Sequence, residues 1–182
     1  MRQRLGYHLF SESYLSAHRS GFVMNNNARR GQIVGTGLIG GSVALALRSA
    51  GWHVTGTDID AQTAERAKKL GVIDATGIDQ EAELTFVAVP AGSLEVEIEK
   101  ALKETKGMVT DTGSVKTGVA RNINDPRFVP GHPMAGSEQD GIEGADERIF
   151  DGAVWVLTPT EGTEDLGPVS YTHLTLPTIL RV

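Results

Sequence analysis

The chain has 182 residues, of which 40% are hydrophobic and 22% are charged, and its formal net charge is −6. This composition is ordinary for a soluble globular protein and argues against a nucleic-acid partner. The chain has no cysteine, which excludes disulfides and thiolate metal sites and suits a reducing cytoplasm. We predict no metal site, and no membrane span either, because no apolar run is long enough for one.

Residues 1–30 stand outside the fold prediction. Arginines and serines with few acids are typical of a transit peptide. The interpretation that we favour is a start assigned too early, with Met24 as the true start and the upstream residues as translated leader. We therefore leave residues 1–30 out of the fold argument and expect them to be disordered.

From Gln32 onward, strand and helix patterns alternate. Strands are predicted at 32–35, 53–57, 72–75, 84–89, 107–111, 127–130 and 153–157, and helices at 38–50, 61–70, 93–104 and 116–123. Gly51 and Gly71 follow the first two helices as C-terminal caps. The alternation predicts an α/β fold over residues 31–165, a Rossmann-like, doubly wound and mostly parallel sheet. Ligands are then expected beyond the carboxyl ends of the strands.

The segment Gly35-Thr36-Gly37-Leu38-Ile39-Gly40 is a GxGxxG motif between the first predicted strand and the first predicted helix. In this context the motif is typical of a dinucleotide-binding turn. Gly35 permits the sharp turn, Gly37 lets the backbone approach a diphosphate, and Gly40 lets helix and strand pack closely. We predict that all six residues bind the cofactor, with the diphosphate at the helix N-terminus. The alternative is a glycine-rich turn in another kind of α/β protein.

Asp58 follows the second predicted strand, 21 residues beyond Gly37. A carboxylate there can accept hydrogen bonds from both hydroxyls of the adenine ribose, and it repels a 2′-phosphate. The sequence therefore favours NAD over NADP as the cofactor.

Three glycine-containing segments follow later strands, at 89–92, 111–116 and 131–138. Small and polar residues suit loops that approach a ligand closely. His132 is predicted on the last of these loops, where an imidazole can act as a general base near neutral pH. The alternative is a histidine that only fixes the loop by bonding to the backbone.

The glycine motif, Asp111-Thr112-Gly113-Ser114-Val115-Lys116 and Gly131-His132-Pro133-Met134-Ala135-Gly136-Ser137-Glu138 resemble the prephenate dehydrogenase family. The last two segments together are the specific part of the resemblance, which covers about residues 31–165. It implies a Rossmann-like domain followed by a helical domain that forms a homodimer. It also implies NAD-dependent oxidative decarboxylation of prephenate to 4-hydroxyphenylpyruvate in tyrosine biosynthesis.

The resemblance implies catalytic roles for two residues. His132 takes the proton of the substrate's ring hydroxyl while the carbinol carbon passes hydride to the nicotinamide, and activity is expected to fall at low pH because the imidazole must be neutral. Ser114 bonds near the same hydroxyl and helps to place His132. The residues implied to complete the cofactor pocket are Val89, Pro90, Thr112 and Gly113.

The chain departs from the family pattern after about Asp165. Residues 166–182 have no helical period, and their threonines and Pro177 disfavour a helix. We hypothesise that 166–182 are a non-native tail derived from a sequencing adapter, and that the helical domain is missing; the alternative is a genuine divergent strand. The fragment is then expected to bind NAD with impaired catalysis.

Two other functions stay open at this point. One is an arogenate dehydrogenase or another NAD(P)-dependent dehydrogenase with the same nucleotide domain. The other is a non-catalytic dinucleotide-binding module.

Overall fold

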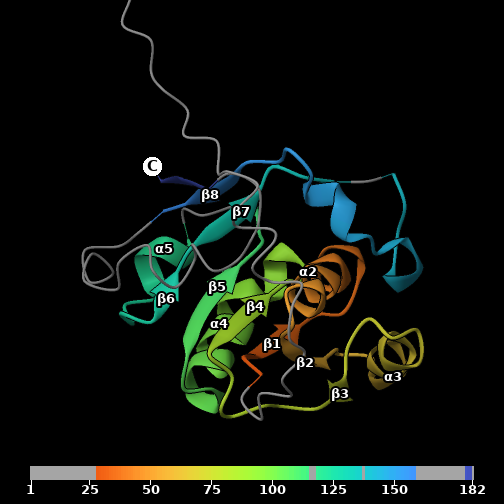
Figure 1. Ribbon diagram of the computed structural model, residues 1–182. Helices are drawn as coiled ribbons and strands as arrows, with labels where there is room; N and C mark the ends of the chain where they lie inside the picture. The colour runs from red at the N-terminus through yellow and green to blue at the C-terminus, as the bar shows by residue number, and fades with distance from the viewer. Residues whose placement is uncertain (1–27, 115–117, 137, 159–178, 182) are drawn as a thin grey trace, which may run out of the picture.

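The computed structural model describes residues 28–114, 118–136, 138–158 and 179–181. The expectations for the leader at 1–30 and the tail at 166–182 therefore fall mostly outside the described residues. Within those residues, Arg30 is the first residue of a strand of the main sheet, and Ile179–Arg181 form a short strand that pairs with Trp155–Leu157, so these two pieces do belong to sheets. The main sheet is parallel, with strand order β3-β2-β1-β4-β5-β6 (Figure 1). Its strands are β1 (Arg30–Val34), β2 (His53–Thr57), β3 (Ala75–Thr76), β4 (Leu84–Val87), β5 (Met108–Asp111) and β6 (Phe128–Val129). The predicted Rossmann-like sheet is confirmed.

Helices cover both faces of this sheet, and its central strands β4 and β5 are buried along their whole length. The helices are α2 (Leu38–Ser49), α3 (Ala61–Lys69), α4 (Leu94–Glu104) and α5 (Val119–Asn122). Neighbouring strand residues belong to different cores: Phe86 packs with α2, whereas Val87 packs with α4. This alternation is what period-two side chains produce when a parallel strand is buried on both faces.

A second, smaller sheet of order β7-β8-β9 follows the main one. Its strands are β7 (Gly131–Pro133), β8 (Trp155–Leu157) and β9 (Ile179–Arg181). The loop predicted at His132 is therefore wrong, since His132 is the central residue of β7 and pairs with Val156 of β8. Glycine and proline on either side of the histidine are typical of a turn, and the pairing partner lies too far along the sequence for a local pattern to reveal it.

One predicted strand is shorter in the structure, and three turns appear that the sequence did not indicate. The strand predicted at 72–75 pairs only at Ala75–Thr76, while Val72 and Ile73 are buried as packing residues. The 3₁₀ turns η1 (Ala91–Ser93), η2 (Ile142–Gly144) and η3 (Glu147–Phe150) were not predicted. The last two cover α2, where a side chain on Gly41 would come within 2.6 Å of Ile142.

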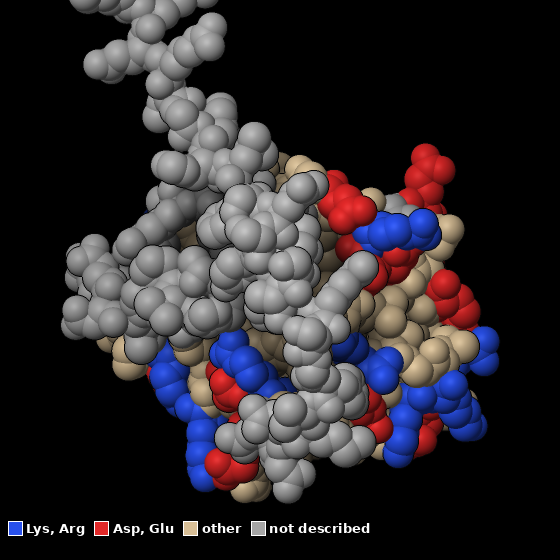
Figure 2. Space-filling model, in the orientation of Figure 1, with Lys and Arg blue, Asp and Glu red and all other residues tan. Residues whose placement is uncertain are grey.

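The surface and helix lengths bear on possible partners. Where the face in Figure 2 is not covered by grey, basic and acidic side chains lie interspersed. Among the described residues, no helix is both long and apolar enough to cross a membrane.

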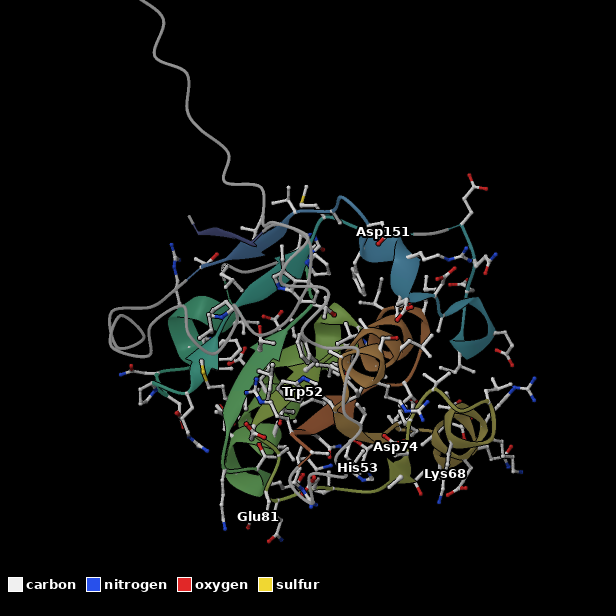
Figure 3. All side chains as sticks on the ribbon, viewed as in Figure 1. Trp52, His53, Lys68, Asp74, Glu81 and Asp151 are labelled. Carbon is white, nitrogen blue, oxygen red and sulfur yellow. The ribbon has the colours of Figure 1, made fainter. Side chains whose placement is uncertain are left out.

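Polar contacts close the amino-terminal edge of the main sheet. Arg30 forms an ion pair with the buried Asp79, at 2.7 Å between Nε and Oδ2. Burial opposes ionisation of Asp79, but hydrogen bonds from Arg30 and from the Glu81 N–H outweigh it and hold the pKa of Asp79 below its ordinary value. At the same edge, His53 lies beside Asp74 (Figure 3), with 3.9 Å between Nδ1 and Oδ2.

Aromatic packing joins the two sheets. The Trp155 ring of β8 lies 5.6 Å from the Phe86 ring of β4 in an edge-to-face arrangement, and 5.7 Å from the Phe150 ring. All three side chains are buried, so β8 is fixed to the main core through Trp155.

We predict that Phe86→Ala lowers the free energy of unfolding by about 3–5 kcal/mol, because it removes a fully buried ring at this junction and leaves a cavity. Urea unfolding followed by tryptophan fluorescence measures the change. The control is Val96→Ala on α4, where 67% of Val96 is exposed and a change within about 0.5 kcal/mol is expected. Similar losses in both variants would contradict the prediction.

Candidate functional site

Four neighbouring strands of the main sheet end in one row. Val34 of β1 pairs with both Thr57 of β2 and Val87 of β4, and Val87 in turn pairs with Asp111 of β5. The residues that follow these strand ends therefore emerge along a single edge. The strand order reverses between β1 and β4, which is where ligands bind in open α/β sheets.

A cleft of about 520 Å³ opens at this reversal point. The residues that line it are Val34, Gly35, Gly37, Thr57, Asp58, Ile59, Ala88, Val89, Pro90, Ser93, Glu97 and Lys100. The structure thus brings together five of the predicted cofactor residues: Gly35, Gly37, Asp58, Val89 and Pro90. Thr36 and Gly40 lie buried behind this wall. Leu38 and Ile39 begin α2 and are half-buried.

The glycines of the motif each meet a different steric demand. Gly35 has φ +90°, and a side chain there would lie 2.4 Å from the Ala88 carbonyl oxygen. A side chain on Gly40 would lie 1.9 Å from the Gly35 carbonyl oxygen, so α2 packs directly on the turn. Gly37, which lines the cleft, has no atom within 4 Å of the equivalent position, so a ligand meets no side chain there.

The N-terminus of α2 suits an anion. Its first N–H groups lack intrahelical partners, as in any helix, and the N-cap residue Gly37 provides no side-chain cap. No acidic residue lies in the first turn. A diphosphate could therefore approach these N–H groups and the positive end of the helix dipole without a competing carboxylate.

Asp58 is fixed by the glycine turn itself. Its Oδ2 accepts hydrogen bonds from the Thr36 N–H at 2.8 Å and from the Thr36 hydroxyl at 3.3 Å, and its Oδ1 accepts one from the Asp60 N–H. The carboxylate is half-buried at the wall of the cleft. A carboxylate has about four acceptor positions, so this one keeps capacity for a ribose hydroxyl while staying oriented.

Sequence reasoning missed several residues of the cleft wall, notably Ser93, Glu97 and Lys100. They are four and three residues apart, which places them on one face of a helix that begins just after a strand end. This helical spacing is the sequence pattern that could have indicated them as cleft residues. Glu97 and Lys100 lie 4.0 Å apart, so the two charges partly balance at the mouth of the cleft.

His132 lies farther along the same edge, beside the residues that follow β5. Its Nδ1 is 3.1 Å from the carbonyl oxygen of Thr112. A carbonyl only accepts, so Nδ1 donates and the neutral ring carries its lone pair on Nε2. Among the described residues Nε2 has no hydrogen-bond partner. The ring thus makes the expected backbone contact and still offers one acceptor nitrogen.

The other predicted residues follow β5. Thr112 and Gly113 lie in the half-buried turn after Asp111, and Ser114 is exposed. They do not line the 520 Å³ cleft, whose wall ends at β4 and α4. Within the described residues, the contact that orients His132 comes from the Thr112 carbonyl and not from the Ser114 side chain. A role of Ser114 toward a substrate stays a prediction.

Comparison with protein families gives a match over most of the chain. Residues 43–170 match the family described as prephenate dehydrogenase, nucleotide-binding domain. A prephenate dehydrogenase of Bacillus subtilis is 36% identical over 148 residues, which cover 72% of this chain and 40% of the relative. A cyclohexadienyl dehydrogenase of Zymomonas mobilis is 33% identical over 145 residues, covering 72% of this chain and 49% of the relative. The chain thus spans less than half the length of these relatives.

Solved structures give the same likeness. An arogenate dehydrogenase of Synechocystis is 33% identical, with a TM-score of 0.74, and the match covers 84% of this chain and 59% of that chain. A prephenate dehydrogenase of Aquifex aeolicus, solved with hydroxyphenyl propionate and NAD⁺, is 28% identical, also with a TM-score of 0.74. That match covers 85% of this chain and 59% of the other.

The glycine geometry predicts opposite outcomes for two alanine substitutions. Gly40→Ala forces the turn and α2 apart and should lower the free energy of unfolding by about 1–3 kcal/mol. Gly37→Ala enters open space at φ −75°, so its unfolding free energy should stay within about 0.5 kcal/mol of wild type. Urea titrations of both variants test this, and an equal loss in the two would show that the steric argument is wrong.

Proposed function

Because the chain belongs to the prephenate dehydrogenase nucleotide-binding domain family, we propose that it binds NAD and serves the oxidative decarboxylation of prephenate to 4-hydroxyphenylpyruvate. The observation that carries the proposal is the arrangement of one sheet edge. A cleft lined by Gly37 and Asp58 lies at the strand-order reversal, and His132 lies at the same edge of the sheet, beside the turn that follows β5.

The residues of the cleft fit NAD. The uncapped N-terminus of α2 and the open side of Gly37 would receive the diphosphate. Asp58, held by Thr36, would accept a hydrogen bond from an adenine-ribose hydroxyl and disfavour NADP by repelling its 2′-phosphate. The solved prephenate dehydrogenase of Aquifex aeolicus, which is 28% identical, contains NAD⁺ and supports this choice of cofactor.

The proposed chemistry assigns proton transfer to His132. Nδ1 is engaged with the Thr112 carbonyl, so Nε2 is the nitrogen that can take the proton of a carbinol hydroxyl. NAD, when bound, supplies the hydride acceptor for the carbon that bears this hydroxyl. Loss of the carboxylate as CO₂ makes the ring aromatic. Ser114 is proposed to bond near the same hydroxyl, and Val89, Pro90, Thr112 and Gly113 to border the nicotinamide.

Arogenate is the second candidate substrate, because the 33% identical structure from Synechocystis is an arogenate dehydrogenase. The two substrates share the ring that reacts and differ in the side chain away from it. Parallel assays with prephenate and arogenate distinguish them. The homodimer implied by the family resemblance stays a prediction.

We predict that Asp58→Asn weakens NAD binding about 10- to 100-fold and narrows the preference for NAD over NADP. The amide loses charge-assisted hydrogen bonds to the ribose and no longer repels a 2′-phosphate. Calorimetric titration with both dinucleotides measures this. Asp60→Asn is the matched control, because Asp60 caps α3 through the Gln62 N–H and asparagine caps equally well. An unchanged NAD affinity in Asp58→Asn would contradict the assignment.

We predict that His132→Asn lowers kcat about 10²- to 10⁴-fold, the usual contribution of a general base, while the Kd for NAD stays within about twofold. The assay follows NADH absorbance with prephenate, for the 182-residue chain and for any longer product of its gene. The control is His53→Asn, at the opposite edge of the sheet, which should keep normal turnover. Normal turnover in His132→Asn would remove His132 from the chemistry.

A further inference from the structure

Asp111 is a buried acid to which the proposed chemistry gives no part. It is the last residue of β5 and has no exposed surface. Its Oδ2 accepts a hydrogen bond from the Gly113 N–H at 2.9 Å, and its Oδ1 accepts one from the Gly131 N–H at 3.1 Å. The two glycines belong to different segments, so this carboxylate joins the turn after β5 to the start of β7.

The two segments that Asp111 joins carry the two partners of the hydrogen bond that orients His132. Thr112 lies between Asp111 and Gly113, and its own N–H is fixed to the Val87 carbonyl at 3.1 Å. Its carbonyl oxygen is the atom that faces Nδ1 of His132, and His132 directly follows Gly131. The carboxylate of Asp111 therefore constrains the two sides of the Thr112–His132 hydrogen bond.

The surroundings leave this bridge little freedom. A side chain on Gly131 would lie 2.6 Å from the Thr110 hydroxyl and 2.8 Å from the indole nitrogen of Trp155. A side chain on Gly113 would lie 2.6 Å from Leu94. Both backbones thus press against the core, and an acceptor-only group between them suits their two N–H donors. An asparagine would offer one oxygen and turn an NH₂ group toward the other donor.

We propose that Asp111 is a positioning residue for His132. By bridging the Gly113 and Gly131 N–H groups it holds the Thr112 carbonyl against Nδ1, which keeps the neutral imidazole in the Nδ1–H tautomer and leaves Nε2 as the proton acceptor. The catalytic meaning of this arrangement rests on the proposed role of His132 as the base, whereas the arrangement itself does not.

The test reads the tautomer of His132 by two-bond ¹H–¹⁵N NMR in the ¹⁵N-labelled chain, at a pH where the ring is neutral. The His132 signals are assigned by their loss in His132→Asn. Wild type should show the Nδ1–H form, and Asp111→Asn should show a mixture with the Nε2–H form. The matched control is Asp79→Asn, which alters another buried acid that accepts backbone and side-chain hydrogen bonds, at the opposite edge of the sheet. Its His132 signals should match wild type.

Two results would overturn the proposal. One is a folded Asp111→Asn chain whose His132 keeps the wild-type tautomer. The other is an Nε2–H tautomer in wild type, a result that needs no folded variant. In an active form of the enzyme, Asp111→Asn should lower kcat about tenfold or more with the Kd for NAD within about twofold. Because the NMR readout needs no turnover, its failure is distinct from a failure of His132 as the base.

Discussion

The common register of β2, β1, β4 and β5 is the constraint on which the site depends. Parallel pairing aligns Thr57, Val34, Val87 and Asp111 in one row, so every segment with a proposed role leaves the sheet at the same edge. A shift of one residue in any pair would also move its apolar side chains to the opposite face. The two cores, which take neighbouring residues of β1, β4 and β5 on opposite faces, therefore fix the site as well as the fold.

Within this edge, the glycine turn and Asp58 form one unit. The close approach of α2 to β1 at Gly40 and Gly35 sets the direction of the helix. Within the same turn, the Thr36 N–H donates a hydrogen bond to Asp58. The positive end of α2 and the carboxylate that would hold the ribose are thus placed relative to each other by backbone geometry. A dinucleotide has its diphosphate and its adenine ribose at a fixed separation, so this mutual placement favours a preformed site.

The small second sheet places His132, which the nucleotide-binding sheet does not carry. Pro130 separates β6 from β7, and the chain crosses from the main sheet to an antiparallel pairing with β8. Trp155 of β8 packs against Phe86 in the main core, while Asp111 and Thr112 hold Gly131 and His132 at the other end of the connection. The packing of Trp155 and the buried carboxylate of Asp111 together hold the His132 imidazole at the sheet edge where the cleft opens.

The sequence alone determined the parts that depend on local pattern. The alternation of strands and helices, the turn at Gly35 to Gly40 and the carboxylate at Asp58 follow from hydrophobic period, glycine spacing and distance along the chain. The structure confirms the parallel sheet and places Gly35, Gly37 and Asp58 along one cleft. Tertiary structure decided the rest. His132 lies on a strand because Val156 pairs with it, Asp111 bridges two segments that are distant in sequence, and Lys100 reaches the cleft only because α4 packs beside β4. These depend on contacts between remote residues, which a periodic pattern does not encode.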